Sequence, residues 1–225
     1  MLDTSHSGKG KQMRQITKTY TLYCYEDLMQ EENLTIKEAV LKKRREYIQE
    51  MDIFERCVAE PTIEKWVEKL SEIGFVNPRI MYSIMYSGFY SQGDGACFDC
   101  DYIDWLTFLN SHEITITKEI ELMYHISPHD LCLKVYKNDF ANHYNNGGTR
   151  YVSASAHANY ENQDLHMAVT SFIQLLNWKR AEYCTEIYRE LQKGYEELQK
   201  DEIILQEIKE CNLEFYENGE FYMEL

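Results

Sequence analysis

The chain has 225 residues, of which 44% are hydrophobic, and its 38 Asp and Glu against 23 Lys and Arg give a net charge of −15 at pH 7. This length and apolar content allow one domain with a full core, and they exclude a chain that is disordered throughout. The acidic balance argues against direct binding to nucleic acid, which needs cationic groups to displace counterions from phosphate.

Cysteine usage and hydropathy indicate the compartment. The seven cysteines are scattered and odd in number, which is typical of reduced thiols in a cytosol. The N-terminus has no apolar segment, and no apolar run approaches the roughly 20 residues that span a membrane. We therefore expect a cytoplasmic protein that does not contact a membrane.

The first residues in chain order are a polar lead-in over 1–15, which we expect to be flexible. A single α+β domain is predicted over 16–225. It opens on alternating Thr and Tyr over 17–25, a pattern that predicts a strand.

Two amphipathic helices are predicted next. Thr35 and Glu38 have the spacing of a capping box, and apolar residues at helical steps continue the pattern over about 35–59. A second helix is predicted over 61–73, because a proline opens it and Gly74 follows its last apolar residue.

Two hairpins are predicted in the middle of the chain. The first joins strands over 79–90 and 96–105 through a glycine-rich turn at 91–95. The second joins strands over 131–136 and 150–158. In the second strand of the first hairpin, alternation predicts that four side chains face the core and that the carboxylates face water or a ligand; the four are Ala96, Phe98, Cys100 and Tyr102.

The C-terminal third is predicted to be mainly helical. Apolar residues at helical steps predict a long helix over about 163–200, roughly 50 Å in length. A shorter helix over 201–211 precedes a hairpin over 212–225 that turns at Asn218-Gly219. The expected fold is therefore α+β: an antiparallel meander of hairpins packed against N-terminal amphipathic helices and one long C-terminal helix.

The most unusual stretch is Ser87-Gly88-Phe89-Tyr90-Ser91-Gln92-Gly93-Asp94-Gly95-Ala96-Cys97-Phe98. It resembles the signature of a family of small, mostly uncharacterised bacteriophage and prophage proteins, some of which are labelled antitoxin-like. The similarity extends to the opening at 20–28 and to the closing segments around 187–202 and 214–219. It implies a phage or mobile-element origin and supplies no activity.

This glycine-rich stretch is also the candidate site, with three interpretations. It is a structural turn, in which glycines adopt conformations closed to other residues, or a ligand loop whose amides and polar side chains read a base or sugar. It is otherwise a divalent-metal site built on Asp94, Asp99 and Asp101. The candidate ligand- or partner-binding residues are Tyr90, Ser91, Gln92, Gly93, Asp94, Gly95, Asp99 and Asp101.

No catalytic set and no resident cofactor or metal is predicted. Cys97 and Cys100 have CxxC spacing, but no second pair completes a zinc site. Side chains three positions apart on a strand also point to opposite faces of the sheet, so the two sulfurs would not meet. Of the histidines, four show no pattern of partner residues: His112, His125, His129 and His166.

Three functions from different classes follow. The first is an acidic, non-enzymatic inhibitor of a host or defence protein, anti-CRISPR-like or anti-restriction-like, whose carboxylates along the strands and the long helix stand in for phosphates. The second sequesters a nucleotide signal in the Gln92-Gly93-Asp94-Gly95 loop. The third is a metal-dependent hydrolase or nuclease. The long helix is also compatible with a homodimer.

Overall fold

The computed structural model describes residues 19–50, 53–76, 84–89, 94–100, 102–114, 131–137, 150–156 and 163–222. These residues belong to two compact units, one made of Met1–Glu46 with Ile204–Leu225 and one of Tyr47–Ile203. The single domain expected over 16–225 stays a prediction, because two compact units can be subdivisions of one domain.

The smaller unit is helical and is closed by the C-terminal segment. It contains α1 (Tyr25–Leu28), the 3₁₀ turn η1 (Glu31–Asn33) and most of α2 (Leu34–Glu50) and α7 (Asp201–Glu210). Phe215 is fully buried and exchanges backbone hydrogen bonds with Tyr23 at 2.9 and 3.1 Å. The other buried apolar residues of the smaller unit are Leu28, Val40, Leu41, Ile204 and Ile208.

A tight turn at Asn218 and Gly219 is fixed against α2. Gly219 has φ +82°, in the region that favours glycine, and a Cβ there would lie 2.5 Å from the carbonyl carbon and oxygen of Ala39. The amide of Glu220 donates to Asn218 Oδ1 at 3.0 Å, and Phe215 pairs with Phe221 in an antiparallel bridge. The predicted Asn-Gly turn of the C-terminal hairpin is thereby confirmed.

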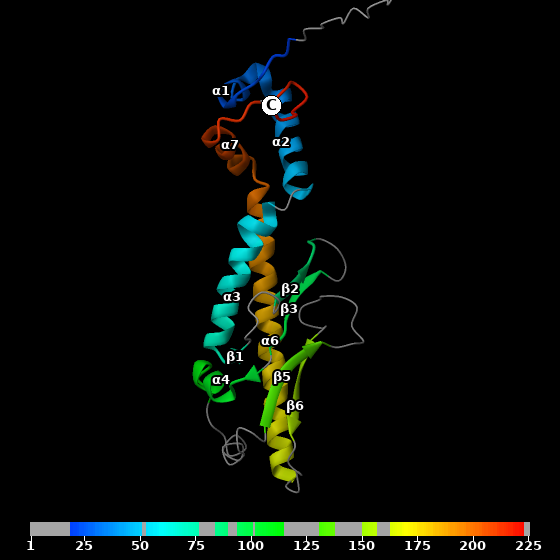
Figure 1. Ribbon diagram of the computed structural model, residues 1–225, viewed down its shortest axis with the longest axis vertical. Helices are drawn as coiled ribbons and strands as arrows, with labels where there is room; N and C mark the ends of the chain where they lie inside the picture. The colour runs from blue at the N-terminus through cyan, green and yellow to red at the C-terminus, as the bar shows by residue number, and fades with distance from the viewer. Residues whose placement is uncertain are drawn as a thin grey trace, which may run out of the picture. The chain divides into compact units, whose positions relative to one another are not determined.

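The larger unit is built around α6 (Gln163–Leu198), which confirms the predicted long helix. Along its length α6 packs against α3 (Glu60–Glu72), the π-helical turn η2 (Glu55–Ala59) and the strands β3 (Gly95–Phe98) and β6 (Arg150–Ala156). Figure 1 shows α3 beside α6. One continuous core joins α3, η2, β3 and α6, and its fully buried members include Phe98, Phe108, Leu176, Ile187 and Leu191.

The described strands form three antiparallel pairs. β2 (Ile84–Ser87) pairs with β3 (Gly95–Phe98), and β5 (Leu131–Lys137) pairs with β6 (Arg150–Ala156), which confirms both predicted hairpins. β1 (Phe75–Val76) pairs with β4 (Tyr102–Ile103), a pairing that the sequence did not predict. The α+β class is therefore correct.

The strand predicted over 96–105 is not continuous: β3 ends at Phe98, and β4 is a separate strand of two residues that pairs with β1. β3 is buried on both faces, so Cys97 lies in the core rather than facing water, and Tyr102 is 41% exposed rather than buried. The chain instead enters α4 (Trp105–Ser111), because Asp104 caps it by accepting from the Thr107 amide at 3.2 Å.

Two N-terminal predictions need correction, one of a helix cap and one of a strand. The helix expected over 35–59 is confirmed by α2 to Glu50 and by helical residues 53–59, which include η2, while 51–52 lie outside the described residues. Thr35 does not cap this helix but lies inside α2, because η1 leads directly into it. In the strand expected over 17–25, the described residues make one bridge, at Tyr23, before α1 begins. Among the described residues, no helix is both long and apolar enough to cross a membrane.

Candidate functional site

The structure describes three of the predicted site residues. Gly95 is buried and lies opposite Ser87 in the β2–β3 register, while Asp94 and Asp99 are half-buried. The other predicted site residues lie outside the described residues: Tyr90, Ser91, Gln92, Gly93 and Asp101. The ligand-loop and metal-site interpretations therefore stay predictions.

The described part of the glycine-rich stretch packs against α6 through aromatic side chains. The ring of Phe89 stacks on Tyr195 with centroids 4.9 Å apart and also contacts Tyr188 at 5.7 Å. Burial, with the nearby charge of Asp94, raises the pKa of Tyr188. The hydroxyl of Tyr86, on β2, donates to Glu55. This half of the stretch holds the hairpin in place.

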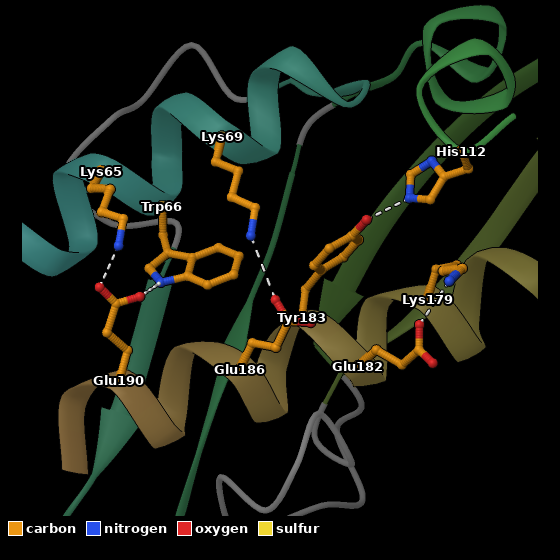
Figure 2. Close-up of polar contacts among 9 residues, drawn as sticks. All are labelled: Lys65, Trp66, Lys69, His112, Lys179, Glu182, Tyr183, Glu186 and Glu190. Carbon is orange, nitrogen blue, oxygen red and sulfur yellow. Dashed lines mark hydrogen bonds and ion pairs between the residues drawn. The ribbon is translucent and has the colours of Figure 1, made fainter. Parts of the chain in front are cut away.

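A polar network joins α3 to α6, and Figure 2 shows its side chains pointing toward one another between the two helices. Glu190 accepts from the Trp66 indole N–H at 2.8 Å and from Lys65. Lys69 lies 3.5 Å from Glu186 and 3.9 Å from the centroid of the Trp66 ring. Both lysines of α3 are therefore turned toward α6 and neutralised there.

The carboxyl of Glu190 is held in its charged form. Burial alone would raise its pKa, but hydrogen bonds from Lys65 and Trp66 outweigh burial and lower the pKa below its usual value. On α6, Glu182 similarly pairs with Lys179 at 2.9 Å. The glutamates at 182, 186 and 190 thus have lysine partners, so this face of the long helix offers little free negative charge.

His112 and Tyr183 form a second polar contact at the end of α4 (Figure 2). His112 Nδ1 lies 2.7 Å from the Phe108 carbonyl, which can only accept, so Nδ1 is the donor in this contact. Nε2 makes a hydrogen bond with the Tyr183 hydroxyl. Burial, followed by the charges of Glu186 and Glu182, raises the pKa of Tyr183 to about 12, so this hydroxyl stays protonated and acts as a donor.

The opposite face of α3 carries an acidic stripe, defined as Glu60, Glu64, Glu68 and Glu72. All four are exposed, and steps of four residues place them on the side of the helix away from buried Trp66 and Leu70. Within the described part of the chain, none of the four has an ion pair. The acidic stripe is therefore the free negative surface of this pair of helices.

The acidic stripe spans about 18 Å, since twelve residues advance 1.5 Å each. One strand of a nucleic-acid duplex carries about five phosphates over that length, at one charge per 3.4 Å. Neighbouring carboxylates are about 6 Å apart, within the Debye length of about 8 Å at physiological salt, so the four charges act together. The stripe can attract a basic surface.

The described residues offer little for other chemistry. No group of three or more His, Cys, Asp or Glu among them is placed to hold a metal ion. Asp104 caps α4 through the Thr107 amide and also accepts from the Thr107 hydroxyl at 2.8 Å.

Sequence reasoning missed the acidic stripe, although its signal was present. Glutamates recur every four residues through the predicted helix 61–73 and its N-terminal flank. The alternation with Lys65 and Lys69 hid the pattern, because the sequence does not show that these lysines are paired with α6.

The comparisons with known proteins place most of this site in one family. No curated protein and no solved structure matches the chain significantly. Residues 59–201 match the sequence model of a domain of unknown function, DUF8835, and this region includes the acidic stripe, the β2–β3 hairpin and α6. The chain belongs to the DUF8835 family.

Proposed function

We propose that this protein acts by binding rather than catalysis, as an acidic inhibitor that occupies the nucleic-acid-binding surface of a host or defence protein in the cytoplasm. The observation that carries the proposal is the acidic stripe on α3. Four carboxylates over about 18 Å approach the charge of one nucleic-acid strand and have no cationic partner among the described residues.

The energetics of α3 support a role for the stripe outside folding. Like charges four residues apart destabilise a helix by about 0.2–0.5 kcal/mol a pair, and the stripe contains three such pairs. The helix dipole adds little to this cost, because it disfavours Glu72 in the last turn of α3 and favours Glu60 in the first turn. The stripe therefore costs stability, by about 1 kcal/mol in all, which is expected of a surface retained for binding.

The choice of partner comes from charge and from the sequence resemblance. A basic channel that binds nucleic acid is complementary to an acidic stripe, and such attraction speeds association. The resemblance of the Ser87–Phe98 stretch to phage proteins points to a defence protein of a bacterial host. The protein itself then needs no direct contact with nucleic acid.

The test compares two variants with equal charge. The stripe variant replaces Glu60, Glu64, Glu68 and Glu72 by Gln. The control variant makes four Glu→Gln changes at exposed positions of the other unit, namely Glu31, Glu32, Glu38 and Glu214. Each protein is immobilised and exposed to a bacterial extract, and captured proteins are identified by mass spectrometry as salt is raised.

We expect the wild type and the control variant to retain the same nucleic-acid-binding protein, and the stripe variant to release it at lower salt while remaining folded and slightly more stable. Equal capture by the stripe variant would overturn the proposal. Equal loss by both variants would also overturn it, because net charge rather than the stripe would then control binding.

A further inference from the structure

The smaller unit contains a surface cavity that the proposed function does not use. It has a volume of about 700 Å³ and lies between the segment entering α1 and the C-terminal turn. It lies outside the matched family region, 59–201, and in a different unit from the acidic stripe. Its lining combines aromatic rings with carboxylates, and the residues used below are Tyr20, Tyr216, Glu217, Asn218 and Glu220.

Two tyrosine rings form adjoining walls of this cavity. The rings of Tyr20 and Tyr216 have centroids 5.2 Å apart and an interplanar angle of 67°. Tyr222 packs edge-on against Tyr216 at 5.9 Å, so the Tyr216 ring is held between two neighbours. Tyrosine faces carry negative electrostatic potential and attract ammonium and guanidinium groups.

The carboxylates lie on a turn with a fixed backbone. Gly219 is buried against Ala39, the Glu220 amide donates to Asn218 Oδ1 at 3.0 Å, and the Tyr216 amide donates to the Glu220 carbonyl at 2.9 Å. Among the described residues, neither Glu217 nor Glu220 has an ion pair. Both glutamates thus line the same cavity as the two rings and have no cationic partner among the described residues.

We propose that this cavity binds an organic cation, an alkylammonium or guanidinium group, between the two tyrosine rings and the carboxylates of Glu217 and Glu220. The cation is either free or the end of a lysine or arginine side chain. The inference does not depend on the proposed function, because the acidic stripe lies in another element and another unit.

The test uses N-acetyl-arginine amide and choline as probes of the two sources, with N-acetyl-citrulline amide as the uncharged counterpart of arginine. Binding to the full chain is followed by two-dimensional amide NMR. We expect saturable shifts at the amides of Tyr20, Tyr216 and Asn218 with dissociation constants in the millimolar range, and no saturable shifts with citrulline. The probe that binds more tightly, arginine or choline, assigns the source.

The matched variants are E217Q/E220Q and, with the same charge change in the same unit, E31Q/E32Q. Loss of one exposed charge or ring weakens such a site by about two- to fivefold, so the loss of two charges in the first double variant should weaken binding by at least about fourfold. The second should change it by less than about twofold. Tyr216→Leu keeps an apolar side chain but removes the aromatic ring, and it should weaken the binding of both cations. Equal shifts with citrulline, equal loss in the two double variants, or no saturation with either cation would overturn the inference.

Discussion

Gly194 offers the sharpest test of the packing of α6. It is the one glycine of this helix, and in an ordinary helix interior replacement of glycine by alanine stabilises by about 1 kcal/mol. Here a Cβ would lie 2.2 Å from Cγ1 of Val58 on η2, and 3.4 Å from its Cβ and Cγ2. The structure therefore predicts the opposite sign for Gly194→Ala.

The magnitude follows from the stiffness of the neighbour. Carbon atoms pack best at about 3.5–4.0 Å, and a β-branched side chain in helical structure has essentially one rotamer, so Val58 cannot rotate away without bringing another methyl closer. Overpacking of this kind costs about 1–3 kcal/mol. After the gain in helix propensity, Gly194→Ala should destabilise the protein by about 1 kcal/mol, which lowers the melting temperature by about 2–4 °C.

The assay is a double-mutant cycle with Val58→Ala, measured by urea unfolding followed by far-UV circular dichroism. In the Val58→Ala background the clash is removed, and Gly194→Ala should stabilise by up to about 1 kcal/mol, giving a coupling energy of about 2 kcal/mol. If Gly194→Ala stabilised both backgrounds equally, the contact between η2 and α6 would be refuted.

Three further predictions concern the turn and the polar network. Gly219→Ala should destabilise the protein by about 2 kcal/mol or more, because it combines a positive φ with a clash against Ala39. In the control Gly88→Ala the new Cβ meets only the Asp94 side chain, at 3.5 Å, and stability should change little. The urea midpoints of unfolding of the two variants test this difference. The pKa of Glu190 is lowered in the folded protein, so the stability that this group contributes is present above its unfolded value of 4.5 and is lost as pH falls through the lowered pKa. In Glu190→Gln the free energy of unfolding should therefore fall less steeply with decreasing pH below 4.5. The pKa of Tyr183 is raised from 10.0 to about 12, so the protein should lose stability as pH rises between these values, and Tyr183→Phe should remove that alkaline loss.

Those elements whose signals are local could be predicted from the sequence. The helix over 163–198 can be predicted because apolar residues recur at helical steps along one face. Both central hairpins follow from alternating residues on either side of glycine- or asparagine-rich turns. The Asn218-Gly219 turn was predicted for the same reason.

The errors arise where a tertiary contact or a cap overrides the local pattern. The alternation after Gly95 continues to Tyr102, but Asp104 ends it by capping α4, where its side chain accepts from the Thr107 amide. The short pairing of β4 with β1 leaves the Tyr102 side chain exposed. Thr35 has the spacing of a cap, but η1 already leads into α2.

The acidic stripe shows the same limit at the level of function. Its glutamates are visible in the sequence, and so are the two lysines that would neutralise them. That Lys65 instead pairs with Glu190, 125 residues away, is a fact of the fold. The sequence prediction placed the phosphate-like charges on the strands and the long helix, whereas the glutamates of the long helix nearest α3 are themselves paired with lysines.

The measurement that tests the central claim most directly is a competition. A protein captured by the immobilised chain is challenged with a short DNA or RNA oligonucleotide at constant salt, and its release is followed as the oligonucleotide is titrated. If the acidic stripe occupies a nucleic-acid-binding surface, the oligonucleotide should release the partner completely, and the stripe variant should require less of it than the control variant. A partner that remains bound at saturating oligonucleotide, or that is released equally from both variants, would contradict the account.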